Sequence, residues 1–213
     1  MTRDEMIILL QERLGARADL NAAIILETVY TQSFLLEGTG AFIPWFLESV
    51  MSTVGTTVAA TETIALPTDF LGEIEDQHAW YYDAANTDNP YQELPKGAYD
   101  NLLQKYPITG IPKAYSIIGD YMAIHPVPDA AYIIKWRYYA RATSLTTNVE
   151  NSWLKHAADL VLAEVGYIMA DKYLQNSNLA TRFQTDIVTA RQRLYVKHEA
   201  RRHANRLYGM GED

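Results

Sequence analysis

PKAYSIIGDYMAIHPVPDAAYIIKWRYY, residues 112–139, is the most strongly β-forming stretch of the chain. Its apolar runs are rich in aromatic and β-branched residues, which favour strands. Gly119-Asp120 predicts a tight turn between the first two runs, and Pro126 and Pro128 predict a rigid turn before the last one. The stretch therefore predicts three strands within one β-rich region.

The sequence before this stretch is also largely extended. Residues 52–66 are rich in Thr and Val, with Gly55 between two extended pieces, and three consecutive aromatic residues at 80–82 predict a further strand. Residues 92–106 instead predict a short helix, because their apolar residues recur at helical spacing near the end. We therefore expect residues 49–149 to form a β-rich insertion with one short helix.

Both ends of the chain carry helical patterns. Thr2 and Glu5 have the spacing of a capping box, Gly15 ends the first helix, and Asp19 begins a second, so residues 1–48 predict a helical hairpin. Residues 150–196 predict another hairpin that begins near Asn151. Neither hairpin can bury its apolar stripe alone, so we expect a four-helix bundle. The predicted fold class is α+β, predominantly a helical bundle with the β-rich insertion at one end.

Charge is distributed unevenly along the chain. Between residues 191 and 206 six cationic side chains accompany one acidic residue, Glu199, so this segment carries about +5 and the rest about −13 of the net charge of −8. The basic tail, residues 197–213, has three interpretations: it docks in a groove of a partner protein, it contacts DNA, or it is a solvated helix end. Leu207 and Tyr208 add an apolar anchor, which favours docking.

The sequence offers no pattern for catalysis, cofactors or metals. The chain has no cysteine, which excludes disulfides and thiolate chemistry. Its five histidines never occur at metal-ligand spacing, and nucleotide-binding and serine-hydrolase motifs are missing. Asp83, Asn86 and Asp88 lie in one loop without the spacing of a calcium-binding EF-hand. Because these patterns are missing, we expect a non-enzymatic protein. No signal peptide or membrane-spanning stretch is evident, so we expect the protein to be made in the cytoplasm.

Several short blocks occur in a set order along the chain. They read LPTDFL (66–71), GIPKAY (110–115), HPVPDAAY (125–132), YYA (138–140) and NSWL (151–154). In this order they resemble the tailed-phage head-to-tail adaptor (connector) family typified by the adaptor of the podovirus SU10, over residues 66–195. The chain departs from the family pattern at 157–161, which read AADLV. The resemblance implies a structural motif made of Leu66, Pro67, Asp69, Phe70, Gly119, Pro126, Pro128, Tyr132 and Trp153.

The resemblance also implies partners and a location. Adaptors of this family form a dodecameric ring between the portal protein and the tail nozzle, so the expected partners are the portal, the nozzle or other tail proteins, and further copies of the chain. Genomic DNA would pass through the lumen during ejection without specific binding, and no membrane is involved. The protein would be part of the virion, assembled in the host cytoplasm. The residues expected to bind the portal are Lys197, Arg201, Arg202, Arg206, Leu207 and Tyr208.

Two other classes of function compete with this interpretation. A DNA-binding module would use the basic C-terminal helix, and its duplex affinity would fall steeply as salt rises. The acidic remainder of the chain argues against such a module. An enzyme would need a pocket lined by titratable groups, for which the sequence supplies no constellation.

Overall fold

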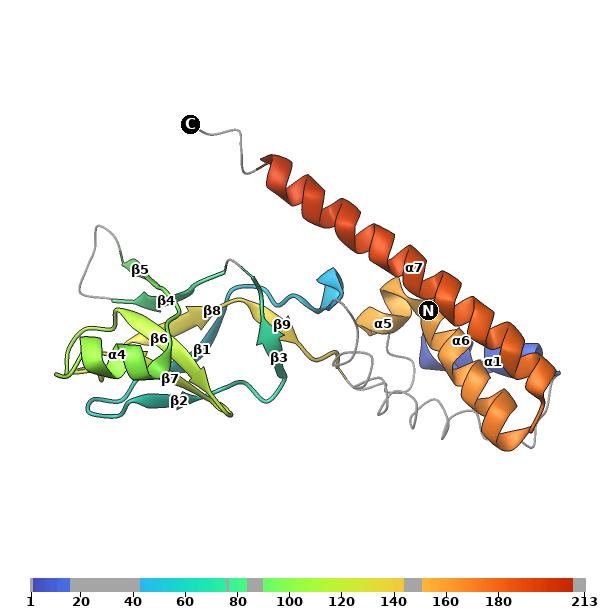
Figure 1. Cartoon of the computed structure of the whole chain (residues 1–213), viewed down its shortest axis with the longest axis horizontal. Helices are drawn as coiled ribbons and strands as arrows, with labels where there is room; N and C mark the ends of the chain where they lie inside the picture. Colours follow the sequence, from blue (N-terminus) through green and yellow to red (C-terminus); the bar gives the residue numbers. More distant parts are fainter. Residues whose placement is uncertain (1, 16–42, 76, 84–89, 144–150, 209–213) are drawn as a thin grey trace. The chain divides into compact units, whose positions relative to one another are not determined.

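The computed structural model describes residues 2–15, 43–75, 77–83, 90–143 and 151–208, the last seven of them by their backbone alone. The chain divides into two compact units (Figure 1). A helical unit comprises Met1–Leu47 and Arg141–Asp213, and a β unit comprises Glu48–Ala140. The helical unit therefore takes its residues from both sides of the β unit in sequence.

An antiparallel four-stranded sheet lies in the β unit. Its order is β1 (Ser52–Thr56), β8 (Ile133–Trp136), β4 (Ala79–Tyr82) and β5 (Tyr91–Leu94). Successive side chains of a strand face opposite sides. Ala79 and Tyr81 of β4, and Ile134 and Trp136 of β8, are accordingly buried on the inner face. The register of β1 shifts next to Gly55, so this glycine lies in the strand instead of between two strands.

The second sheet has three antiparallel strands. Its order is β2 (Thr63–Ala65), β7 (Tyr121–His125) and β6 (Ala114–Ile118). Gly119 and Asp120 form the two-residue turn between β6 and β7, because Ile118 pairs with Tyr121. Gly119 has a φ of 55°, a left-handed conformation that glycine adopts without steric cost. The predicted turn at this position is confirmed.

Residues from both sheets form one core. Past Leu94 the chain reaches Lys96, which bridges to Tyr115 of β6 and so links the two sheets. Helix α4 (Tyr99–Lys105), whose Leu102 is buried, packs on β6. Strand β3 (Phe70–Glu73) pairs with β9 (Tyr138–Ala140). The buried cluster consists of Ala79, Tyr81, Leu94, Tyr115, Met122, Ile124, Tyr132, Ile134, Trp136 and Tyr138.

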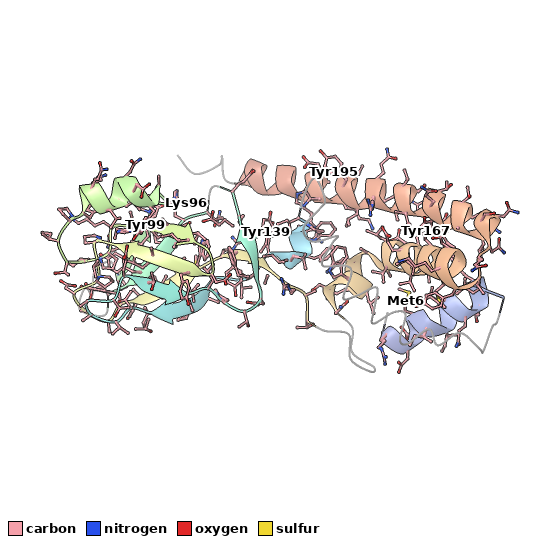
Figure 2. The ribbon with its side chains drawn as sticks, turned by 60° about the horizontal axis from the view of Figure 1, so that its bottom comes forward. Met6, Lys96, Tyr99, Tyr139, Tyr167 and Tyr195 are labelled. Carbon is pink, nitrogen blue, oxygen red and sulfur yellow. The ribbon has the colours of Figure 1, made fainter. Side chains whose placement is uncertain are left out.

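Helix α1 (Arg3–Arg13) opens the helical unit. The predicted capping box is confirmed: the backbone N–H of Thr2 donates to the Glu5 carboxylate at 2.9 Å, and that of Glu5 donates to the Thr2 hydroxyl at 3.4 Å. Gly15, with a φ of 84°, follows the end of the helix. Met6 is fully buried on the side of α1 that faces α6 (Ala158–Ile168) (Figure 2).

The remaining helical elements precede and follow α6 in the sequence. Before it come the single turn η1 (Trp45–Leu47) and α5 (Ser152–His156), and after it the π turn η2 (Met169–Tyr173) and α7 (Ser177–Tyr208). The Asn151 side chain accepts the Leu154 N–H at 2.9 Å, which confirms the predicted helix start. Asn176 starts α7 in the same way, since its side chain accepts the Leu179 N–H at 3.1 Å.

The predicted predominantly helical bundle is wrong, although the fold is α+β. Among the described residues nine strands form three antiparallel sheets around a β-rich core. The aromatic and β-branched residues of the β unit bury one another across its sheets, so this region is a folding core of its own. The second N-terminal helix, predicted from Asp19, lies outside the described residues.

The predicted helix over 92–106 is also partly wrong. Residues 91–94 form β5, whose backbone pairs with β4 from Tyr91 opposite Tyr82 to Leu94 opposite Ala79. Pro95 follows β5, and the helix begins only at Tyr99. Backbone pairing with the preceding strand β4 therefore overrides the local helical spacing.

Candidate functional site

The predicted partner-binding residues belong to α7, a helix of 32 residues. One side of α7 packs on α6, and its buried residues recur every three or four positions: Ala180, Phe183, Ile187, Ala190, Leu194 and His198. Gly166 of α6 makes room for Phe183, because a Cβ at Gly166 would lie 2.4 Å from the Phe183 ring. The two helices therefore approach closely near the N-terminal end of α7.

The buried stripe continues into the predicted tail. His198 is only 6% exposed, and the Arg201 guanidinium lies 5.0 Å from the centroid of the Trp45 ring. A guanidinium over an indole face is attracted by the negative charge of that face. Trp45 in turn packs edge-on against Phe46 at 5.3 Å and against His156 at 5.8 Å. Arg201, although predicted to bind the portal, is therefore engaged within the helical unit.

The other predicted tail residues follow the same helix. Lys197 is exposed, and Arg202, Arg206, Leu207 and Tyr208 lie on its last two turns. Helix α7 passes residue 197 without a break. At 1.5 Å per residue, residues 202–208 extend the helix by roughly 10 Å.

Some charged side chains of α7 form ion pairs with other helices of the helical unit. Arg191 pairs with Glu164 of α6 at 2.7 Å, and Asp186 lies 3.9 Å from Arg13 of α1. Within the described part of the chain, Arg182, Arg193 and Lys197 form no ion pair. These cations are exposed, so they are available to an acidic partner.

The motif residues from Leu66 to Phe70 hold the turn before β3. Leu66 donates its backbone N–H to Asp120 at 2.9 Å, and Phe70 donates its own to Pro67 at 3.0 Å. The Asp69 carboxylate accepts the Tyr138 hydroxyl at 3.0 Å, and the Phe70 ring stacks on Trp136 at 5.4 Å. This part of the motif therefore attaches the turn to the core.

The later motif residues shape the connections around β7 and β8. Pro126 follows a cis peptide bond, and the Pro128 carbonyl accepts the Ala60 N–H at 2.8 Å. The Tyr132 hydroxyl donates to Asp129 at 2.8 Å. Trp153 is buried in the helical unit, where its ring lies 5.1 Å from that of Phe46. Trp153 belongs to the helical unit and the other motif residues to the β unit, where each supports local structure.

Four buried tyrosines, Tyr81, Tyr115, Tyr132 and Tyr138, have raised pKa values, and burial is the main cause for each. Burial, reinforced by Asp129, raises the pKa of Tyr132 to about 12. Burial and the hydrogen bond to Asp69 raise the pKa of Tyr138 to about 12. Burial and the neighbouring Glu73, whose carboxylate accepts the Tyr115 hydroxyl at 3.2 Å, raise the pKa of Tyr115. The folded state therefore favours the neutral, protonated form of these tyrosines.

A cluster around His125 has no counterpart among the predicted sites. His125 is fully buried at the end of β7, with Nε2 3.5 Å from the Glu62 carboxylate and its ring 5.4 Å from that of Tyr99. Burial lowers the pKa of His125. Strand alternation did not reveal this histidine, because both faces of β7 are covered and its residues 122–125 are all buried.

The described residues lack both metal-binding clusters and membrane-spanning helices. In the part of the chain that the structure describes, His, Asp and Glu form no group of three able to hold a metal ion. Asp83 belongs to that part, whereas Asn86 and Asp88 of the acidic loop lie outside it. No described helix combines the length and apolar character needed to cross a membrane.

Comparison with known proteins identifies the family. No curated protein matches the chain. A family model described as SU10 adaptor protein matches residues 1–209, which takes in α1, the β unit and α7. The match extends well beyond the stretch over which the sequence blocks resemble that family. The chain therefore belongs to the SU10 adaptor family, a family of structural phage head-to-tail adaptors.

Proposed function

We propose that this chain forms a ring at the head-to-tail junction of a phage virion, with the C-terminal end of α7 bound to the portal and the β unit available to tail proteins. The observation that carries the proposal is the cationic end of α7, which continues as one helix to Tyr208 from a packed base. Membership of an adaptor family supports the portal and the tail proteins as partners.

The base of α7 supports a docking role for its end. His198 and Arg201 hold the helix to the helical unit, and Arg202, Arg206, Leu207 and Tyr208 follow beyond them. Cations near a helix C-terminus are stabilised by the helix dipole and attract acidic surfaces. Leu207 and Tyr208 add apolar contact area, which suits a groove on a partner protein.

The charge of the remaining chain supports a channel for DNA. Outside residues 191–206 the chain carries about −13, and like charge avoids the counterion release that drives DNA binding. Genomic DNA would pass such a wall without being held. A dodecameric ring would place one adaptor on each portal subunit.

The test is the mass of the complex with the portal of the same phage, measured by light scattering. We expect one adaptor per portal subunit, and we expect deletion of residues 202–213 to abolish the complex. The deletion begins after Arg201 because His198 and Arg201 pack inside the helical unit. Deletion of 209–213 alone, which spares α7, is the control. A complex that survives the longer deletion would exclude the helix end as the contact.

The same samples separate the adaptor from the alternative DNA-binding module. If the wild-type protein forms no portal complex but binds duplex DNA at low salt, with affinity that falls steeply as salt rises, the basic helix is a DNA contact. An adaptor ring predicts the reverse pattern.

A further inference from the structure

Helix α7 carries a second stripe on the side opposite to α6. Its members recur at steps of four and three residues: Thr181, Thr185, Val188, Gln192 and Tyr195. Thr189 and Val196 lie beside them. All seven are exposed, with Val188 at 63% and Val196 at 61%. We call this set the outer face of α7.

The threonines of the outer face present methyl groups. The hydroxyls of Thr181, Thr185 and Thr189 donate to the backbone carbonyls of Ser177, Thr181 and Thr185, at 2.9, 3.1 and 3.0 Å. Because each hydroxyl donates within its own helix, the group left toward solvent is largely apolar. Together with Val188 and Val196, these residues form an uncharged surface along several turns.

Such a surface is unusual for a helix side that meets only water. Surface helices carry charged residues on the side away from the core, and β-branched residues such as Val and Thr form helices less readily than Lys, Glu or Ala. On α7 cations lie beside the outer face instead: Arg182, Arg193 and Lys197 recur along one border, on which Asp186, 3.9 Å from Arg13, is also found. Alternating steps of three and four are the spacing of a seam that packs on another protein surface.

Charge complementarity indicates which surface covers this face. The cationic border has no acidic partner among the described residues of its own chain, whereas the chain outside 191–206 carries about −13. Acidic side chains of a second copy would complement this border. In a ring, each copy contacts the next through two different patches, so a basic patch can meet an acidic one at every junction.

We propose that the outer face of α7 packs against the acidic surface of the neighbouring copy, an inference that rests on the proposed ring. The uncharged residues form the centre of this contact, and Arg182, Arg193 and Lys197 form its charged rim. Rim charges that steer and orient partners make assembly sensitive to salt.

Site-directed photo-crosslinking in the portal-bound complex tests this contact. The chain has no cysteine, so Val188→Cys carries a benzophenone maleimide at a single position. We expect irradiation to give covalent adaptor dimers and longer adaptor chains. Ile8→Cys, on α1 and 56% exposed, is the matched control and should give no such products. Crosslinks from position 188 to the portal, or to residues 16–42 of the same chain, would overturn the proposal.

A charged substitution provides the second readout. We expect Val188→Asp combined with Val196→Asp to raise the adaptor concentration that half-saturates the portal by at least about tenfold, because the new carboxylates would be buried against the acidic surface of the neighbouring copy. Ile8→Asp should leave it unchanged, and circular dichroism checks that both variants keep their helices. Unchanged assembly of the double variant would refute the contact while leaving portal binding intact. Absence of any wild-type portal complex would instead refute the proposed function, and with it the ring contact.

Discussion

The Arg201 guanidinium lies over the Trp45 ring, 5.0 Å from its centroid, and this contact ties the C-terminal end of α7 to the short turn η1. Both residues belong to the helical unit, yet they lie on opposite sides of the β unit in the sequence. The contact divides the predicted tail into two parts. Residues up to Arg201 are packed on their own unit, and the residues beyond it continue α7 as a helix.

Removal of the Arg201 charge should loosen the end of α7. We expect Arg201→Met to cost about 0.5–1 kcal/mol, the usual strength of an exposed cation–π contact. Hydrogen exchange of the backbone amides between 198 and 208 should become faster. Arg193→Met is the matched control on the same helix, because Arg193 has no ion pair among the described residues, and it should leave exchange unchanged. Equal effects of the two variants would argue against a role for Trp45.

Gly166→Ala should destabilise the contact of α6 with α7. An alanine normally stabilises a helix relative to glycine, but here its Cβ would lie 2.4 Å from the Phe183 ring. We expect a net loss of about 1–3 kcal/mol, as for other overpacked cores. Urea denaturation followed by circular dichroism measures it. Phe183→Leu in the Gly166→Ala background should recover part of the loss, and a neutral or stabilising Gly166→Ala would contradict the close approach.

Tyr138→Phe should weaken the attachment of the turn before β3. The Tyr138 hydroxyl donates to Asp69 at 3.0 Å, and a hydrogen bond to a carboxylate contributes about 1.5–3 kcal/mol. We expect a loss near the lower end, because the pair is only partly buried. A double-mutant cycle with Asp69→Ala isolates the pair. Tyr121→Phe, at a residue 51% exposed, should change the free energy of unfolding by less than about 0.5 kcal/mol.

Tyr132 and Tyr138 predict that the stability of the protein falls at alkaline pH. The pKa values of Tyr132 and Tyr138 are about 12 in the folded protein, above the ordinary value of 10.0. The unfolded chain therefore loses these protons first as the pH rises. The stability that the two tyrosines contribute is complete below pH 10 and is lost as pH rises toward 12. Tyrosinate absorbance should show a late-titrating fraction that shifts to ordinary pKa values in denaturant. Titration of every tyrosine near 10 in the folded protein would contradict this environment.

His125 predicts the opposite response to acid. Burial lowers its pKa below the ordinary value of 6.5, so the unfolded state binds a proton at pH values where the folded state does not. The stability that neutral His125 contributes to the β unit should be complete above about pH 6.5, and it should be lost as pH falls through the pKa of His125 in the folded state. The groups facing His125 are Glu62, 3.5 Å away, and the Tyr99 ring. His125→Phe should flatten stability between pH 7.5 and 5, measured by urea denaturation, while His78→Phe at a half-exposed site should not.

Local sequence signals predicted several features that the structure confirms. The capping box of Thr2 and Glu5, the glycine stop at Gly15, the Gly119-Asp120 turn and the helix start at Asn151 all depend on residues within a few positions of one another. Backbone conformation and capping are short-range properties, so a short stretch specifies them. The ordered sequence blocks likewise identified the family, because they were read directly from residue identities.

Pairing and packing between elements decided the rest. Residues 92–94 became a strand because β4 offers a partner, and His125 became buried because both faces of β7 are covered. The fold class changed for the same reason, since inward-facing residues of separate strands meet in one core only after the chain has folded. In the candidate site, the sequence by itself determined a cationic helix end, whereas only the tertiary structure set Arg201 on Trp45 and left the outer face of α7 exposed. Side-chain packing joins residues far apart in the chain, and local patterns carry no record of those partners.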